Sequence, residues 1–106
     1  MKPADESPSD MFSFRLYITG DSQNSVEAIA NLTALCRTHM RDRHEIEFVD
    51  VSVHPERALV DGIFVTPTLI KFAPSPMRMI VGTLTNPQPL MRALGLNGAA
   101  KLSDAV

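Results

Sequence analysis

The chain lacks a second cysteine, because Cys36 is the only one among its 106 residues. An internal disulfide and a Cys-x-x-Cys redox pair are therefore both excluded. A lone free thiol is typical of a reducing compartment, so we expect a cytoplasmic protein. Cys36 falls on the apolar side of a predicted helix, where core packing is favoured over thiol reactivity.

Other absences exclude whole classes of function. No apolar run approaches the ~20 residues of a membrane span. Ten Lys+Arg against twelve Asp+Glu give a net charge of −2, without the basic stripe of a nucleic-acid binder. His39, His44 and His54 lack metal-ligand spacing, Asp50 has no paired carboxylate or histidine nearby, and no Gly-rich phosphate loop occurs. We therefore expect no enzyme: no catalytic, cofactor or metal site, and neither nucleic acid nor membrane as a partner.

What is present is the pattern of one α/β domain, since 106 residues with 44% hydrophobic content suffice for a single core. Asn24 and Glu27 fit a helix capping box, while Pro55 and Gly62 mark the start and stop of a short helix. The second strand becomes apolar throughout, as a central parallel strand would. The predicted elements are a strand at 12–19, a helix from 24 to about 40, a strand at 45–51, a helix at 56–61, a strand at 63–72 interrupted at Pro67, a strand at 77–81 and a helix from 87 to about 94.

The order βαβ-α-ββ-α is that of a thioredoxin-like domain. That fold normally carries its redox cysteines where the first strand meets the first helix. Here the turn is Gly20-Asp21-Ser22-Gln23-Asn24-Ser25, without a cysteine. A thioredoxin-like fold that lacks the redox cysteines predicts a protein that recognises a partner and does not catalyse a redox reaction. We place this domain at 12–96, after a disordered lead-in at 1–11 that resembles no targeting peptide, and before a flexible tail at 97–106.

An ordered set of short motifs lies between positions 12 and 96: Leu16-Tyr17-Ile18-Thr19-Gly20, Asn24-Ser25, Ala28, Val49-Asp50-Val51, Pro55, Thr66-Pro67-Thr68-Leu69, Pro74, Pro76, Arg78, Ile80, Gly82 and Leu84. This set resembles the pattern of the KaiB family of clock proteins. The chain departs from the usual pattern at Ser22-Gln23, at Gly82-Thr83, and at Pro87 and Pro89, which indicates a divergent bacterial member.

The resemblance implies a non-enzymatic regulator that binds a ring-shaped, RecA-like KaiC-type ATPase and changes its phosphorylation or ATPase cycle. It also implies two folds, a thioredoxin-like monomer that binds the partner and a second state that self-associates as a dimer or tetramer. The residues give independent support, because Thr66-Pro67 also fits the start of a helix and two folds can lie within a few kcal/mol of each other. Pro67, Pro74 and Pro76 are the candidate positions for a cis peptide bond or for the change of fold.

The predicted partner surface is the short helix together with the Thr66-Pro67 edge. Glu56, Arg57 and Asp61 are its charged candidates, and charges at such a rim set partner choice and encounter rate. Two alternatives stay open at this point. One is a thioredoxin-like sensor or adaptor module of a histidine-kinase pathway, which predicts a C-terminal extension with kinase motifs. The other is a redox protein, which predicts a low-pKa cysteine at the first turn.

Overall fold

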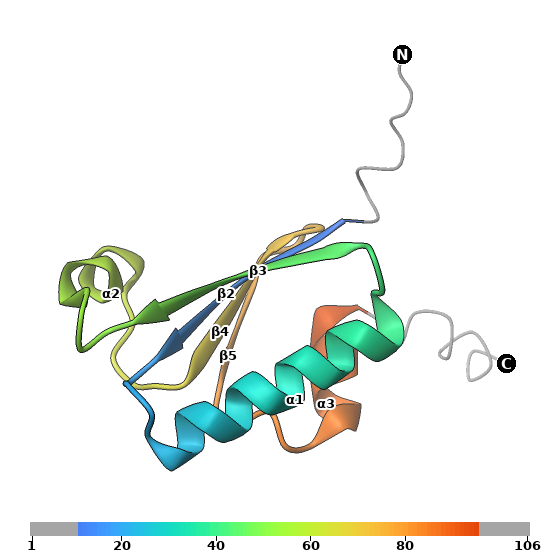
Figure 1. Cartoon of the computed structure of the whole chain (residues 1–106). Coiled ribbons are helices and arrows are strands. Elements are labelled where there is room, and N and C mark those ends of the chain that lie inside the picture. Colours follow the sequence, from blue (N-terminus) through green and yellow to red (C-terminus); the bar gives the residue numbers. More distant parts are fainter. Residues whose placement is uncertain (1–10, 96–106) are drawn as a thin grey trace, which may run out of the picture.

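A four-stranded sheet with the order β3-β2-β4-β5 forms the frame of the molecule (Figure 1). The computed structural model describes residues 11–95, so residues 1–10 of the predicted lead-in and the whole predicted tail at 97–106 lie outside the described residues. Strand β2 (Phe12–Ile18) runs parallel to β3 (His44–Asp50). Strand β4 (Thr68–Ala73) pairs antiparallel with both β2 and β5 (Arg78–Val81).

Helix α1 (Gln23–His39) connects the two parallel strands. It begins earlier than predicted, because Ser22 and not Asn24 is its N-cap: the Ser22 hydroxyl accepts a hydrogen bond from the Ser25 N–H at 3.2 Å. Glu27 does not close a capping box with Asn24, since its carboxylate accepts a hydrogen bond from the Thr85 hydroxyl at 3.0 Å. A tertiary contact to the loop before α3 therefore replaces the expected local one.

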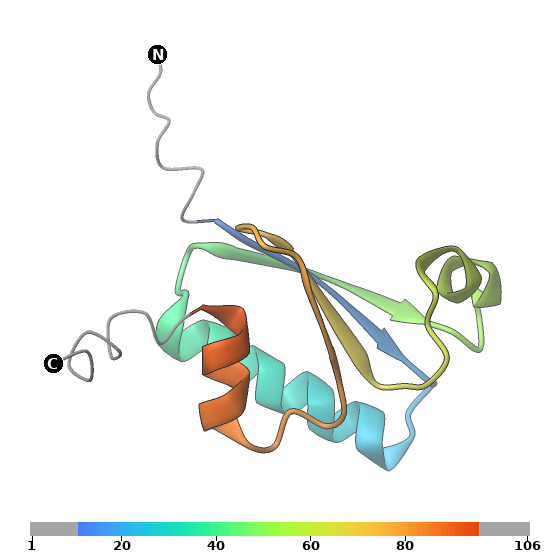
Figure 2. The ribbon, with the colours of Figure 1, turned by 180° about the vertical axis from the view of Figure 1, so that it is seen from behind.

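Helices α1 and α3 (Pro87–Leu94) lie together on one face of the sheet (Figures 1 and 2). Cys36 belongs to the core between them and the sheet, with no exposed surface. Burial raises the pKa of its thiol to about 11, which confirms it as a packing residue. The core cluster consists of Phe12, Phe14, Leu16, Ala28, Leu32, Leu35, Cys36, Met40, Leu69, Leu84, Leu90 and Leu94.

Helix α2 (Pro55–Asp61) lies on the opposite side, at one corner of the sheet (Figure 1). Pro55 stands in its first turn and Gly62 ends it in the left-handed conformation, with φ +71°, as predicted. Its apolar contacts are few, because the cluster on this face contains only Tyr17, Val49, Ala58, Ile63 and Ile70.

Three predictions about the sheet are wrong in detail. Among the described strands β3 lies at an edge, and most of its side chains are partly or fully exposed. Strand β4 begins only at Thr68, because 63–67 is a loop whose Thr66–Pro67 peptide bond is cis. The sequence also favours Met77 and Met79 as adaptable core residues, but both are exposed.

The bonds Ala73–Pro74 and Ser75–Pro76 are also cis, so all three candidate prolines have this geometry in the structure. They flank β4 on both sides and shape its two ends. At the far end of β4, the Lys71 ammonium is buried and donates to the carbonyl oxygen of Leu94 at 3.3 Å. Burial, with the charge of Arg78, lowers the pKa of Lys71. A cation at this position suits the C-terminal end of α3.

Candidate functional site

The turn between β2 and α1, where a thioredoxin-like protein would carry its thiols, is held by hydroxyl groups and by the carboxylate of Asp50 at the end of β3. Asp50 accepts hydrogen bonds from the Gly20 N–H at 3.0 Å and from the Ser52 hydroxyl at 2.6 Å. These contacts hold the pKa of Asp50 below its usual value. The hydroxyls of Thr19 and Thr66 share a hydrogen bond, which ties the turn to the loop before β4. Asp50 is thus a structural anchor that joins the turn to the end of β3.

A polar network attaches α2 to the sheet. The Arg15 guanidinium lies 2.8 Å from Glu47 and 2.7 Å from Asp61, and Arg57 lies 2.8 Å from the second oxygen of Glu47. The Tyr17 hydroxyl donates to the Asp61 carboxylate and lies 3.1 Å from the carbonyl oxygen of Arg57. The network therefore holds both ends of a helix that is only seven residues long.

The electrostatics of the network follow from these contacts. Hydrogen bonds from Arg57 and Arg15 lower the pKa of Glu47 to about 2. The hydrogen bond from Tyr17 holds the pKa of Asp61 below its ordinary value, and Arg15 adds to the effect. Burial, followed by the contact with Asp61, raises the pKa of the Tyr17 hydroxyl. Both carboxylates are thus ionised and paired over the physiological range.

The residues predicted to bind a partner divide into two groups. Arg57 and Asp61 are brought together, but their charged ends face the network. Glu56 points outward, with a 68% exposed side chain and an oxygen 3.6 Å from His54 Nδ1. Thr66 is half-buried and Pro67 is buried. Arg57 and Asp61 therefore serve mainly to hold the helix, and the accessible surface has a different character.

That accessible surface is apolar, which the sequence reading missed. Ala58 and Ile63 are buried, while the other apolar residues between positions 59 and 65 are exposed. The sequence contains this signal, because six of the eight positions from 58 to 65 are apolar, and the last turn of a seven-residue helix with a short loop cannot bury them all. We call the exposed set the apolar corner; its exposed fractions are Leu59 76%, Val60 83%, Phe64 91% and Val65 52%.

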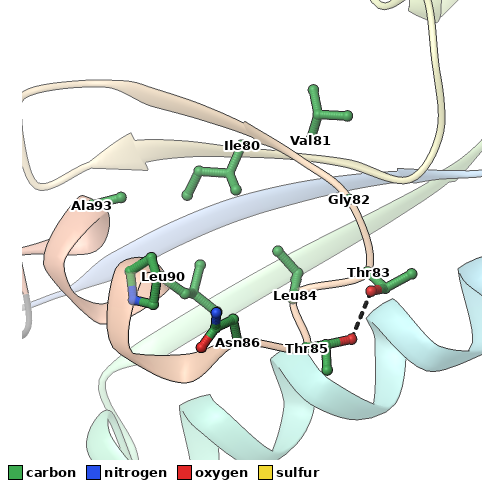
Figure 3. Close-up of a pocket in the computed structure, with 10 residues that line it drawn as sticks. Ile80, Val81, Gly82, Thr83, Leu84, Thr85, Asn86, Leu90 and Ala93 are labelled. Carbon is green, nitrogen blue, oxygen red and sulfur yellow. Dashed lines mark hydrogen bonds between the residues drawn. The ribbon is translucent and has the colours of Figure 1, made fainter.

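Two concave features accompany these elements. A small cavity of about 170 Å³ lies behind the loop and is lined in part by Ile63, Phe64 and Thr66. A larger groove of about 440 Å³ lies between β5 and α3 on the other face. Figure 3 shows Leu84 and Leu90 beside this groove and the hydrogen bond between the Thr83 and Thr85 hydroxyls at 2.7 Å. Neither feature has a charged residue in its lining.

Residues 11–95 contain no candidate metal site and no candidate membrane-spanning helix. No group of three histidine, cysteine, aspartate or glutamate side chains in that range is arranged to hold a metal ion. No helix in the same range is long and apolar enough to cross a membrane.

Solved structures share the fold at low sequence identity. Chloroplastic thioredoxin z has a TM-score of 0.69 at 16% identity, covering 87% of this chain and 83% of that one. The N-terminal domain of SasA from Synechococcus elongatus has a TM-score of 0.65 at 16% identity, covering 80% and 84%. The predicted thioredoxin-like α/β fold is confirmed.

Sequence comparison is more specific. The circadian clock protein KaiB3 of Synechocystis sp. is 42% identical over 82 residues, which cover 77% of this chain and 80% of that protein. The circadian clock oscillator protein KaiB of Synechococcus elongatus is 32% identical over 90 residues, covering 85% and 88%. These names are those of clock proteins and not of enzymes. The family model described as the KaiB domain matches residues 15–96, and the chain therefore belongs to the KaiB family of circadian clock proteins.

Proposed function

We propose that the chain is a cytoplasmic timing regulator that binds a KaiC-type ATPase and alters its phosphorylation or ATPase cycle. The observation that carries the proposal is a KaiB-family domain with a thioredoxin-like frame whose first turn holds hydroxyls in place of thiols. A protein without catalytic groups acts on a reaction by binding the enzyme that performs it, so any nucleotide chemistry belongs to the partner.

The corner of the sheet that carries α2 is the proposed contact surface. It includes the predicted positions Glu56 and Thr66, which are accessible in whole or in part. Arg57 and Asp61 contribute by fixing the orientation of the helix. Pro67 contributes through the path of the chain, because its ring is buried and its carbonyl oxygen accepts a hydrogen bond from the Gly82 N–H at 2.9 Å.

A redox role has no support in the geometry. Cys36 lies in the core beside Leu32 and Met40, and burial raises the pKa of its thiol to about 11. Since the thiolate is the reactive form, such a cysteine is a poor nucleophile at neutral pH. We expect Cys36→Ala to bind the ATPase as the parent does, and neither protein to reduce insulin catalytically.

The second, self-associating fold stays a prediction. Its test is sedimentation velocity combined with backbone NMR over a concentration series. Two slowly exchanging sets of amide signals for residues 63–95, with one growing as the oligomer grows, would support it. A single set at every concentration would contradict it.

Fluorescence anisotropy tests the central proposal. The chain is labelled at its N-terminal amine and titrated with the KaiC-type ATPase of its host, with ATP and with ADP, over several hours. We expect slow binding that depends on the nucleotide. If a chain shown to be folded binds in neither state, the proposal loses its basis.

A further inference from the structure

The apolar corner combines high exposure with a rigid backbone. Phe64 is 91% exposed, yet the loop that carries it is held on both sides. The Ile63 N–H donates to the carbonyl oxygen of Ala58 at 2.8 Å, and the Thr68 hydroxyl donates to that of Val65 at 2.7 Å. Exposed apolar clusters of this kind mark interaction sites, and a loop ordered before binding loses little entropy when it docks.

The surroundings of the corner show which kind of surface it fits. The nearest charges of α2, on Arg57 and Asp61, are neutralised by Glu47 and Arg15 within the chain. Glu56 is the remaining charge of the helix. A contact dominated by long-range attraction would need unpaired charges at its centre. The charge pattern instead fits an apolar, uncharged cleft surrounded by a polar rim.

The shape of the corner argues against a second copy of this chain as its main partner. Helix α2 projects from one corner of the sheet (Figure 2), and a two-fold contact would have to place this same projecting corner of both copies against each other, with no cleft to receive Phe64. The groove between β5 and α3 is apolar enough to receive a phenylalanine (Figure 3), but it lies on the other face of the sheet. Copies joined in this way would meet through two different surfaces, and such a contact gives a closed assembly only where its rotation completes a ring.

We propose that the apolar corner inserts into an apolar cleft of the partner ATPase, with Phe64 as the dominant contact residue. The inference rests on the proposed function and adds to it the chemistry of recognition: burial of apolar side chains, with Arg57 and Asp61 acting as positioning residues. Large aromatic residues in fully desolvated pockets dominate most interfaces, while rim charges contribute little.

The test compares two phenylalanines in the anisotropy assay. Phe64→Ala removes the proposed contact, and Phe48→Ala is the matched control, because Phe48 is an exposed phenylalanine on β3 with 46% exposure. We expect Phe64→Ala to weaken binding by at least about tenfold, and Phe48→Ala to change it by less than about threefold. Circular dichroism and thermal unfolding of each variant verify the fold. Because the contact is apolar, raising KCl from about 50 to 500 mM should change parent affinity by less than about threefold.

The outcomes separate this inference from the function on which it rests. If the parent binds and Phe64→Ala binds equally well, the apolar corner is not the contact and only the inference is overturned. A steep loss of parent affinity with salt would overturn it as well. If the parent does not bind at all, both proposals fail. Sedimentation of the chain alone tests whether a second copy of the chain binds the apolar corner. If the chain self-associates and Phe64→Ala abolishes the self-association, the corner binds a second copy and the inference is overturned.

Discussion

The two faces of the sheet are closed in different ways. On one face α1 and α3 cover the strands with aliphatic side chains, including Leu16, Leu32 and Leu94, which have at most 1% exposure. On the other face a seven-residue helix is held at one corner by ion pairs and by the hydroxyl of Tyr17. The first arrangement buries most of its large apolar residues, whereas α2 and the loop after it leave Leu59, Val60, Phe64 and Val65 exposed.

The difference separates stability from recognition. Burial of apolar surface is the dominant favourable contribution to folding, so the face with α1 and α3 should carry most of the free energy of unfolding. The polar network contributes less, because partly exposed ion pairs are screened by water. It does orient α2, and it leaves the apolar residues of that helix free for a partner.

The largest effect is expected from the aliphatic face. Leu32→Ala removes a fully buried side chain of α1, and such a cavity typically costs about 2–5 kcal/mol. Urea denaturation followed by circular dichroism measures the loss. Because Leu32 is remote from α2, the folded fraction should bind the ATPase with parental affinity. A loss below about 1 kcal/mol would show that this face is not the main source of stability.

A smaller and more local effect is expected from the network. Asp61→Ala removes one partner of Arg15 and one of the two acceptors of the Tyr17 hydroxyl, which leaves the carbonyl oxygen of Arg57 at 3.1 Å. Unsatisfied partly buried donors cost about 1–3 kcal/mol. Amide hydrogen exchange should accelerate in α2 well before it accelerates in α1. Tyr17→Phe should accelerate the exchange in α2 less than Asp61→Ala does, since it leaves the pair of Asp61 with Arg15 intact. Equal acceleration in both helices would mean that the network does not act locally.

Acid should weaken the same network. The pKa of Glu47 is about 2 in the folded chain against an ordinary 4.5, and that of Asp61 is also lowered. A carboxyl with a depressed folded pKa stabilises the fold above its unfolded pKa, and this contribution is lost as the pH falls toward the folded value. Since the Glu47 side chain is 46% exposed, solvent screening limits its share to under about 1 kcal/mol. Unfolding measured between pH 7 and 2.5 should show a shallower loss for Glu47→Gln, and identical curves would contradict the assignment.

The smallest effect on stability is expected at the apolar corner. Phe64→Ser changes a side chain that is 91% exposed, and surface substitutions usually stay within about 0.5 kcal/mol. The urea midpoint should therefore match that of the parent even where binding is lost. A destabilisation above about 1 kcal/mol would mean that Phe64 packs within the fold, which would remove the contrast between the two faces.

Short sequence patterns predicted those helices whose first and last residues are determined by a single proline, asparagine or glycine. Pro55 and Gly62 bound α2 as the sequence indicated, and Asn86 and Gly95 bound α3. These residues act through their own backbone preferences, which hardly depend on the rest of the chain. The choice between Ser22 and Asn24 as N-cap was not decided locally, because both residue types cap helices well.

The sequence placed the partner surface on α2 and the Thr66-Pro67 edge, with Glu56, Arg57 and Asp61 as its charged candidates, and that assignment stays a prediction. It did not show that Arg57 and Asp61 pair with the sheet. Asp61 and Arg15 are separated by 46 positions in the sequence. Whether a charge meets solvent or an opposite charge depends on which strand lies beneath it, and no local pattern contains that information.

Composition and short-range order were enough to define one α/β domain, its family and the absence of a thiol at the first turn. Those properties depend on residue types and on spacing along the chain. Packing alone decided that β3 lies at an edge of the described sheet, that Lys71 is buried, and that Phe64 is exposed while Ile63 is not. Each of these depends on contacts between segments distant in sequence, whose free energy is settled only when the sheet and its helices come together.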